Sequence, residues 1–171
     1  MSAMALALTS LCLGAGGECE RGDRLDVSDV SAHRTSEDVG ALEVLWKREA
    51  SKINDATLRD CFLQTFKGRI CTQDGRLAQA LMGTAKSDES VLRAEALFFL
   101  RYFDLQSVST VVRGALADPA VQVRLAALAS ISYLHDRQAR SQVESLALSD
   151  PNDSVRQYAN KVLKSLVKPA T

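Results

Sequence analysis

The sequence contains little of what catalytic and metal-binding proteins need. It has no Cys-x-x-Cys pair, no glycine-rich phosphate loop and no metal-binding helix motif. Its two histidines, His33 and His135, lie far apart, and His135 falls at an expected helix end, where it is predicted to cap the helix. We therefore predict that the protein is not an enzyme and that it uses no catalytic residue, no cofactor and no metal.

An excess of one charge sign is also lacking. Lysine plus arginine and aspartate plus glutamate both number 21, so no global field attracts nucleic acid or an anionic membrane. Proline (three residues) and aromatic residues (5%) are scarce, whereas hydrophobic residues make up 46% of the 171 residues. This composition indicates one globular domain of helices packed through small side chains.

The chain begins with an uncharged, mostly apolar run at residues 3–17, "AMALALTSLCLGAGG". The run is too short to span a bilayer but has the length of a signal-peptide hydrophobic region, although no basic residue precedes Arg21. We interpret residues 1–17 as a signal peptide or apolar tail, residues 18–35 as an irregular linker or cap, and residues 36–171 as the folded domain. Export to the periplasm or the medium is favoured, with a cytoplasmic location as the alternative.

Two of the four cysteines, Cys61 and Cys71, are separated by nine residues. This spacing suits a helix end and the turn after it, so a disulfide between them is expected in an oxidising compartment. In a reducing compartment the two residues would instead act as small buried hydrophobic groups. The sequence leaves both alternatives open.

One pattern occurs twice, as "DPAVQVRLAALASI" from Asp118 and "DPNDSVRQYANKVL" from Asp150. The two aspartates are predicted helix N-caps, and Pro119 and Pro151 are predicted to occupy the first helical position. Apolar residues then recur at spacings of four, with an alanine in the middle. Each copy is therefore predicted to form a helix with one buried stripe that a neighbouring helix can approach closely.

The arginine of this pattern recurs along the chain. Arg93 precedes Arg124 and Arg156 at nearly the same spacing, and Arg59 continues the series less regularly, as expected of a terminal repeat. No strand alternation is found after Asp26. Another helical stretch precedes each arginine helix, at residues 36–51, 75–86, 105–117 and 137–148. The sequence therefore predicts an all-α fold of about four stacked helical hairpins.

These Asp-Pro…Val-Arg…Ala segments resemble the second helix of short HEAT repeats, of the kind found in phycobilisome-lyase-like proteins. The resemblance covers residues 75–167 well and residues 36–70 loosely. It implies an α-solenoid wound as a right-handed superhelical array. It also implies a structural, hydrogen-bonded ladder between repeats. The ladder residues would be Asp118, Arg124, Asp150 and Arg156.

The segment "LFFLRYFDL", residues 97–105, differs from the alanine-rich background. Its polar and aromatic positions, together with the positions at equivalent offsets in later copies, would form a mildly basic, tyrosine-containing strip. Such a strip could hold an acidic peptide or a partner's loop. Ordinary packing between hairpins is the alternative. The strip would consist of Phe98, Arg101, Tyr102, Tyr133, Lys161 and Lys164.

The leading functional hypothesis is a non-catalytic protein-interaction or scaffold module, such as an exported bacterial assembly factor, that binds another protein or a peptide. The resemblance also raises an accessory subunit of a chromophore-lyase-like enzyme. A HEAT-like DNA-binding protein is a third hypothesis, with little support from the 14 basic against 10 acidic residues after residue 60. We expect no nucleic-acid partner and no stable membrane span, and the sequence does not define the oligomeric state.

Overall fold

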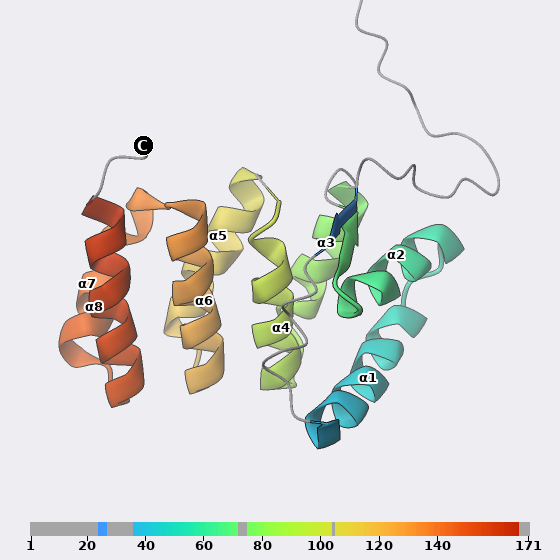
Figure 1. Ribbon diagram of the computed structural model, residues 1–171, viewed down its shortest axis with the longest axis horizontal. Helices are drawn as coiled ribbons and strands as arrows, with labels where there is room; N and C mark the ends of the chain where they lie inside the picture. Colours follow the sequence, from blue (N-terminus) through green and yellow to red (C-terminus); the bar gives the residue numbers. More distant parts are fainter. Residues whose placement is uncertain (1–23, 27–35, 72–74, 104, 168–171) are drawn as a thin grey trace, which may run out of the picture.

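The computed structural model describes residues 24–26, 36–71, 75–103 and 105–167 (Figure 1). The described chain is mostly helical, which confirms the predicted all-α character. The α-helices are α1 (Ser36–Ser51), α2 (Ala56–Phe66), α3 (Gly75–Thr84), α4 (Ser90–Leu100), α5 (Gln106–Gly114), α6 (Val121–Leu134), α7 (Arg140–Ser149) and α8 (Asp153–Val167). Two 3-10 helices, η2 (Ala115–Ala117) and η3 (Arg137–Ala139), and two strands, β1 (Arg24–Asp26) and β2 (Arg69–Cys71), complete the described elements.

Four helices occupy the stretches that were predicted to precede the arginine helices. α1 spans the predicted residues, and α3 ends at Thr84 rather than at residue 86. α5 ends at Gly114 and continues as η2, whereas η3 leads into α7. A tight 3-10 turn continues an α-helix without a break in the apolar pattern, which is why the sequence predicted one longer helix in each place.

The predicted all-α fold omits one short pair of strands, for which the sequence shows no alternation. β2 pairs antiparallel with β1, and Leu25 lies opposite Ile70. Each strand has three residues, which is too few for an alternating pattern to be recognised in a sequence. Ile70 is fully buried and β2 packs against α2, so this pair of strands extends the core. β1 lies in the stretch predicted to be an irregular linker.

The helices that bear Arg59, Arg93, Arg124 and Arg156 are α2, α4, α6 and α8, hereafter the arginine helices. α4, α6 and α8 stand side by side, with α4 packed against α6 and α6 against α8 (Figure 1). They carry a fully buried alanine at the same place in each helix. A small side chain at the contact lets two helix axes come close. These residues are Ala96, Ala127 and Ala159.

Large rings take the place of these alanines at the amino-terminal end. Trp46 of α1 is fully buried. Its ring centroid lies 4.5 Å from that of Phe62, 5.8 Å from that of Phe66 and 5.7 Å from that of Phe99. The indole therefore joins α1, α2 and α4 in one aromatic core.

The longest described helix, α1, has 16 residues. No helix in the described ranges combines the length and the apolar character that crossing a membrane requires.

Candidate interaction site

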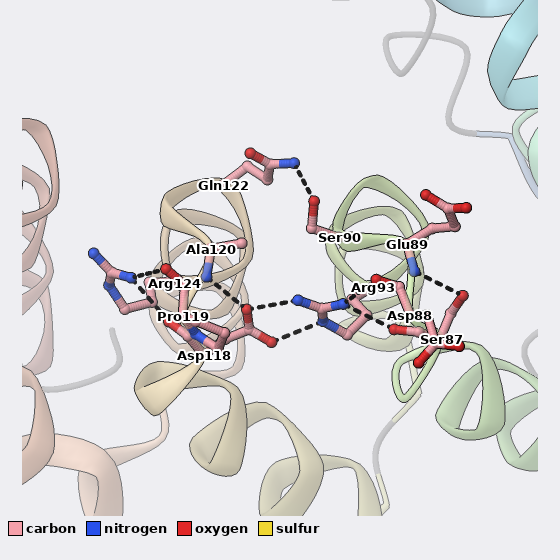
Figure 2. Close-up of polar contacts among 10 residues, drawn as sticks. All are labelled: Ser87, Asp88, Glu89, Ser90, Arg93, Asp118, Pro119, Ala120, Gln122 and Arg124. Carbon is pink, nitrogen blue, oxygen red and sulfur yellow. Dashed lines mark hydrogen bonds and ion pairs between the residues drawn. The ribbon is translucent and has the colours of Figure 1, made fainter.

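Arginine–aspartate pairs join neighbouring arginine helices. Nε and Nη2 of Arg93 donate to Oδ2 and Oδ1 of Asp118 at 2.8 and 2.9 Å (Figure 2). Arg124 makes the same two bonds to Asp150 at 2.8 and 2.9 Å. Only 9% of the Arg124 side chain and 2% of the Asp150 side chain are exposed. Two parallel bonds fix the plane of the guanidinium against the carboxylate, so each pair sets the register of one helix on the next.

All four arginines also bind the turn that precedes their own helix. In each copy Nη1 donates to the backbone carbonyl oxygen six residues earlier, over 2.6 to 2.9 Å. The donor and acceptor residues are Arg59 and Ile53, Arg93 and Ser87, Arg124 and Asp118, and Arg156 and Asp150. The same local structure is therefore built four times, including the irregular first copy.

The prediction that Asp118 and Asp150 are helix N-caps is wrong. Oδ1 of each accepts a hydrogen bond from the backbone N–H two residues later, at 2.8 Å. The helices begin three residues after each aspartate, so Pro119 and Pro151 lie in the turns and not at the first helical positions. Each carboxylate binds the arginine of the preceding arginine helix and the turn after itself, rather than the first turn of the helix that follows. In α8, Asn152 is the cap and accepts the N–H three residues later.

These two pairs, Arg93–Asp118 and Arg124–Asp150, form the ladder. Arg156 was predicted to be a ladder residue, but it pairs with Asp153 of its own helix at 3.0 Å, because no further aspartate turn follows α8 in the described residues.

The ladder keeps both aspartates ionised. Hydrogen bonds from Arg93 lower the pKa of Asp118, and a backbone N–H adds to this effect. Burial opposes ionisation of Asp150, but hydrogen bonds from Arg124 and a backbone N–H outweigh it, so the pKa of Asp150 is also lowered. Each pair is thus a charge-assisted contact at neutral pH.

A further ion pair joins α5 to the turn that follows α6. Nη1 of Arg113, in α5, donates to Oδ2 of Asp136 at 2.7 Å, and the other carboxylate oxygen accepts the N–H of Gln138. Sequence reasoning missed this pair because Arg113 has no counterpart in neighbouring copies, where Met82 and Ser145 occupy the equivalent positions. An aspartate directly after a predicted helix end was the only signal.

Four of the six predicted strip residues are in contact. The guanidinium carbon of Arg101 lies 3.7 Å from the ring centroid of Phe98, 5.0 Å from that of Tyr102 and 5.1 Å from that of Tyr133. Nη2 of Arg101 donates to the Tyr102 hydroxyl at 2.9 Å. Tyr133 is 52% exposed, so these four residues, hereafter the Arg101 cluster, reach the surface between α4 and α6.

The other two strip residues, Lys161 and Lys164, are exposed on α8. In the described part of the chain neither ammonium group lies within ion-pair distance of a carboxylate. Ser132, next to Tyr133 in the sequence, hydrogen-bonds Ser165, next to Lys164, at 3.1 Å. The predicted strip therefore comprises a packed cluster and two separate lysines on a neighbouring helix.

His135 is the C-cap of α6, as predicted, but its backbone rather than its charge is the notable feature. Its φ of 49° places it in the left-handed region. The next N–H, that of Asp136, donates to the carbonyl oxygen of Ile131 at 3.2 Å. The residue thus ends the helix by a left-handed turn, a place where glycine is usual.

Two predicted features involve side chains or residues that the structure does not describe. Cys61 is buried in α2 and Cys71 ends β2, but the side chain of Cys71 is not described. The disulfide between them stays a prediction. Residues 1–17, interpreted as a signal peptide or apolar tail, are also outside the described residues.

Comparison of the chain with protein-family models, curated proteins and solved structures found no match. The ladder and the Arg101 cluster are therefore the two features from which a function can be proposed.

Proposed function

We propose that this protein is a HEAT-like α-solenoid of about four hairpins, wound as a right-handed array, that acts as a non-catalytic interaction or scaffold module. The arginine contact repeated in four helices and the ladder between α4, α6 and α8 support the repeat arrangement. In such arrays each repeat packs against its neighbours and the stack offers an extended surface rather than a closed pocket.

The Arg101 cluster carries the functional part of this proposal. Tyrosine and arginine are enriched among the residues that dominate binding energy at protein interfaces. Tyr133 is half exposed although its ring packs edge to face on Tyr102, with centroids 5.3 Å apart. A tyrosine that is already held loses little conformational entropy when a partner covers it. The partner is thus a protein segment that crosses α4 and α6.

Two alternative functions follow from the sequence: DNA binding, and an accessory role in a lyase-like enzyme. DNA binding needs several free cations for phosphate contacts. Arg93, Arg113 and Arg124 are already bound to carboxylates, which leaves fewer charges for that purpose. A role as an accessory subunit of a lyase-like enzyme also requires a protein partner, and so it is a special case of the interaction module.

Site-specific photocrosslinking in the native host tests the proposal. A photoreactive phenylalanine analogue at position 133 should form a defined protein adduct. The same analogue at Val44, which is 66% exposed on α1, is the matched control and should not form that adduct. Identical adducts from both positions, or none from position 133, would contradict the proposal. A nucleic-acid adduct would favour the DNA-binding alternative.

A further inference from the structure

Arg101 differs from the other well-packed arginines in what holds it. Arg93, Arg113 and Arg124 each bind a carboxylate at 2.7 or 2.8 Å. Arg101 instead contacts three rings and one tyrosine hydroxyl, and no carboxylate in the described ranges lies within ion-pair distance of it. Its positive charge therefore has no anionic partner in the described part of the chain.

The Nε–Nη2 edge of Arg101 lacks a full set of hydrogen bonds, although the same edge binds aspartate in two other arginines. In Arg93 and Arg124, Nε and Nη2 together bind the carboxylate. In Arg101 the neutral Tyr102 hydroxyl takes Nη2, whereas Nε is buried with no acceptor in the described residues. An unsatisfied buried donor is unfavourable, so a ligand that supplied an acceptor at this edge would stabilise the arginine.

The rest of the cluster favours an anion as well. Phe98 covers one face of the guanidinium, so its N–H groups are left to bind in the plane of the group. A guanidinium has no acceptor, and the Tyr102 hydroxyl, which already accepts from Arg101, keeps its own O–H to donate. Lys161 and Lys164, both exposed, add positive charge on α8.

We propose that the Arg101 cluster binds an acidic segment of a partner protein. One aspartate or glutamate carboxylate displaces the Tyr102 hydroxyl, draws the guanidinium outward and accepts from both Nε and Nη2, as Asp118 and Asp150 do in the ladder. Neighbouring acidic residues of the segment face the two lysines of α8. This inference rests on the proposed function and adds the chemistry of the partner.

Fluorescence anisotropy with two labelled peptides tests the inference. One probe is a short peptide of alternating glutamate and phenylalanine, and its twin has glutamine in place of glutamate. The protein should bind the glutamate probe and not the twin. Because hydrogen bonds to a charged group are strong, Arg101→Gln should weaken binding roughly ten- to a hundredfold. Arg101→Lys should show an intermediate loss, since lysine keeps the charge but not the paired donors.

Arg140→Gln is the matched control, because Arg140 is an exposed arginine of α7 paired with Glu144. It should leave binding unchanged, and thermal unfolding should show that all variants fold. Equal binding of the glutamine twin, unchanged binding by Arg101→Gln or an equal loss in Arg140→Gln would overturn the inference. Duplex DNA that competes with the glutamate probe, and whose affinity falls more than that of the probe in Arg101→Gln, would also overturn the inference. A protein adduct at position 133 together with any of these results would leave the interaction module standing and reject only the acidic partner.

Discussion

The arginine helices between α4 and α8 meet through buried ion pairs, whereas α1, α2 and α4 meet around one indole ring. In the first region Arg124 and Asp150 are almost fully buried beside small alanines. In the second, Trp46 packs on Phe62 and Phe99. Both regions bury apolar surface, but only the first adds buried ion pairs between its helices in the described residues. In the second, the Arg76–Asp55 pair is exposed, at 59% and 46% of the two side chains.

Position 87 is one place where the two regions differ. Ser87 stands where the later copies have Asp118 and Asp150. It still performs the local role, because its hydroxyl accepts the N–H of Glu89 two residues later at 3.3 Å. It carries no negative charge, and α2, unlike α6, does not pack beside α4, so the ladder has no further pair at this place in the described residues. A side chain at this position can therefore bind its own turn without also binding an arginine of a neighbouring helix.

Ion pairs and large rings fix the register of packed helices in different ways. Burial of apolar surface is not directional, so alanine-rich helices need another feature to fix their register. A bidentate arginine–carboxylate pair does this through geometry. A large ring does it through shape, since close-packed interiors tolerate no voids.

Removal of the indole should have the largest effect. Trp46→Ala leaves a cavity among three phenylalanines and should lower the free energy of unfolding by about 3–5 kcal/mol. Val44→Ala, at an exposed position of the same helix, is the control and should change it little. Urea denaturation followed by circular dichroism measures both. A small loss in Trp46→Ala would show that the amino-terminal region is held by something other than its rings.

Breaking the ladder should have the next largest effect. Arg124→Met keeps the side-chain volume but leaves Asp150 buried without a cation, and should cost about 3 kcal/mol in the same assay. Arg156→Met is the control. It also removes the contact of its arginine to the preceding turn, but its ion pair with Asp153 is exposed, at 36% and 67% of the two side chains. Exposed pairs contribute little and one hydrogen bond about 1 kcal/mol, so this variant should lose clearly less than Arg124→Met. Equal losses would mean that the ladder has no special role.

Acid should weaken the two regions unequally. The folded-state pKa values of Asp118 and Asp150 are lowered, so their stabilisation is complete above the ordinary value of 3.8 and is lost as the pH falls below it. The free energy of unfolding should therefore decrease with acidification. The decrease should be shallower in Asp118→Asn/Asp150→Asn and unchanged in slope in Trp46→Ala. The same slope in all three proteins would contradict the assignment.

The smallest effect is expected at the end of α6. His135 is a non-glycine residue in the left-handed region, which is strained for an L-amino acid. His135→Gly should raise the free energy of unfolding by about 0.5–1 kcal/mol. His135→Ala, which keeps the strain, should give no such gain. Calorimetric melting of the two variants side by side distinguishes them.

Most of the helical organisation could be predicted because its signals are local. The recurring arginines and the apolar spacing of four located the hairpins, and α1 occupies the predicted residues. The β1–β2 pair could not be found, since three residues carry no period. The role of Asp118 was misjudged because an Asp-Pro sequence suits both a helix cap and a ladder turn.

The candidate site was only partly predictable for a similar reason. Repeat offsets correctly put Phe98, Arg101, Tyr102 and Tyr133 together, because equivalent positions of packed helices are neighbours. The stacking of the guanidinium and its buried Nε depend on side-chain conformations and on the distance between α4 and α6, which no sequence pattern encodes. Only the three-dimensional structure therefore distinguishes Arg101 from the other arginines.

The ladder depends most directly on the pair formed by Arg124 and Asp150. A double-mutant cycle with Arg124→Met and Asp150→Asn measures the coupling between the two side chains. If the ladder joins neighbouring helices, the cycle gives a favourable coupling of about 2 kcal/mol. A coupling of zero, with Arg124→Met equally costly whether position 150 is aspartate or asparagine, would contradict the account.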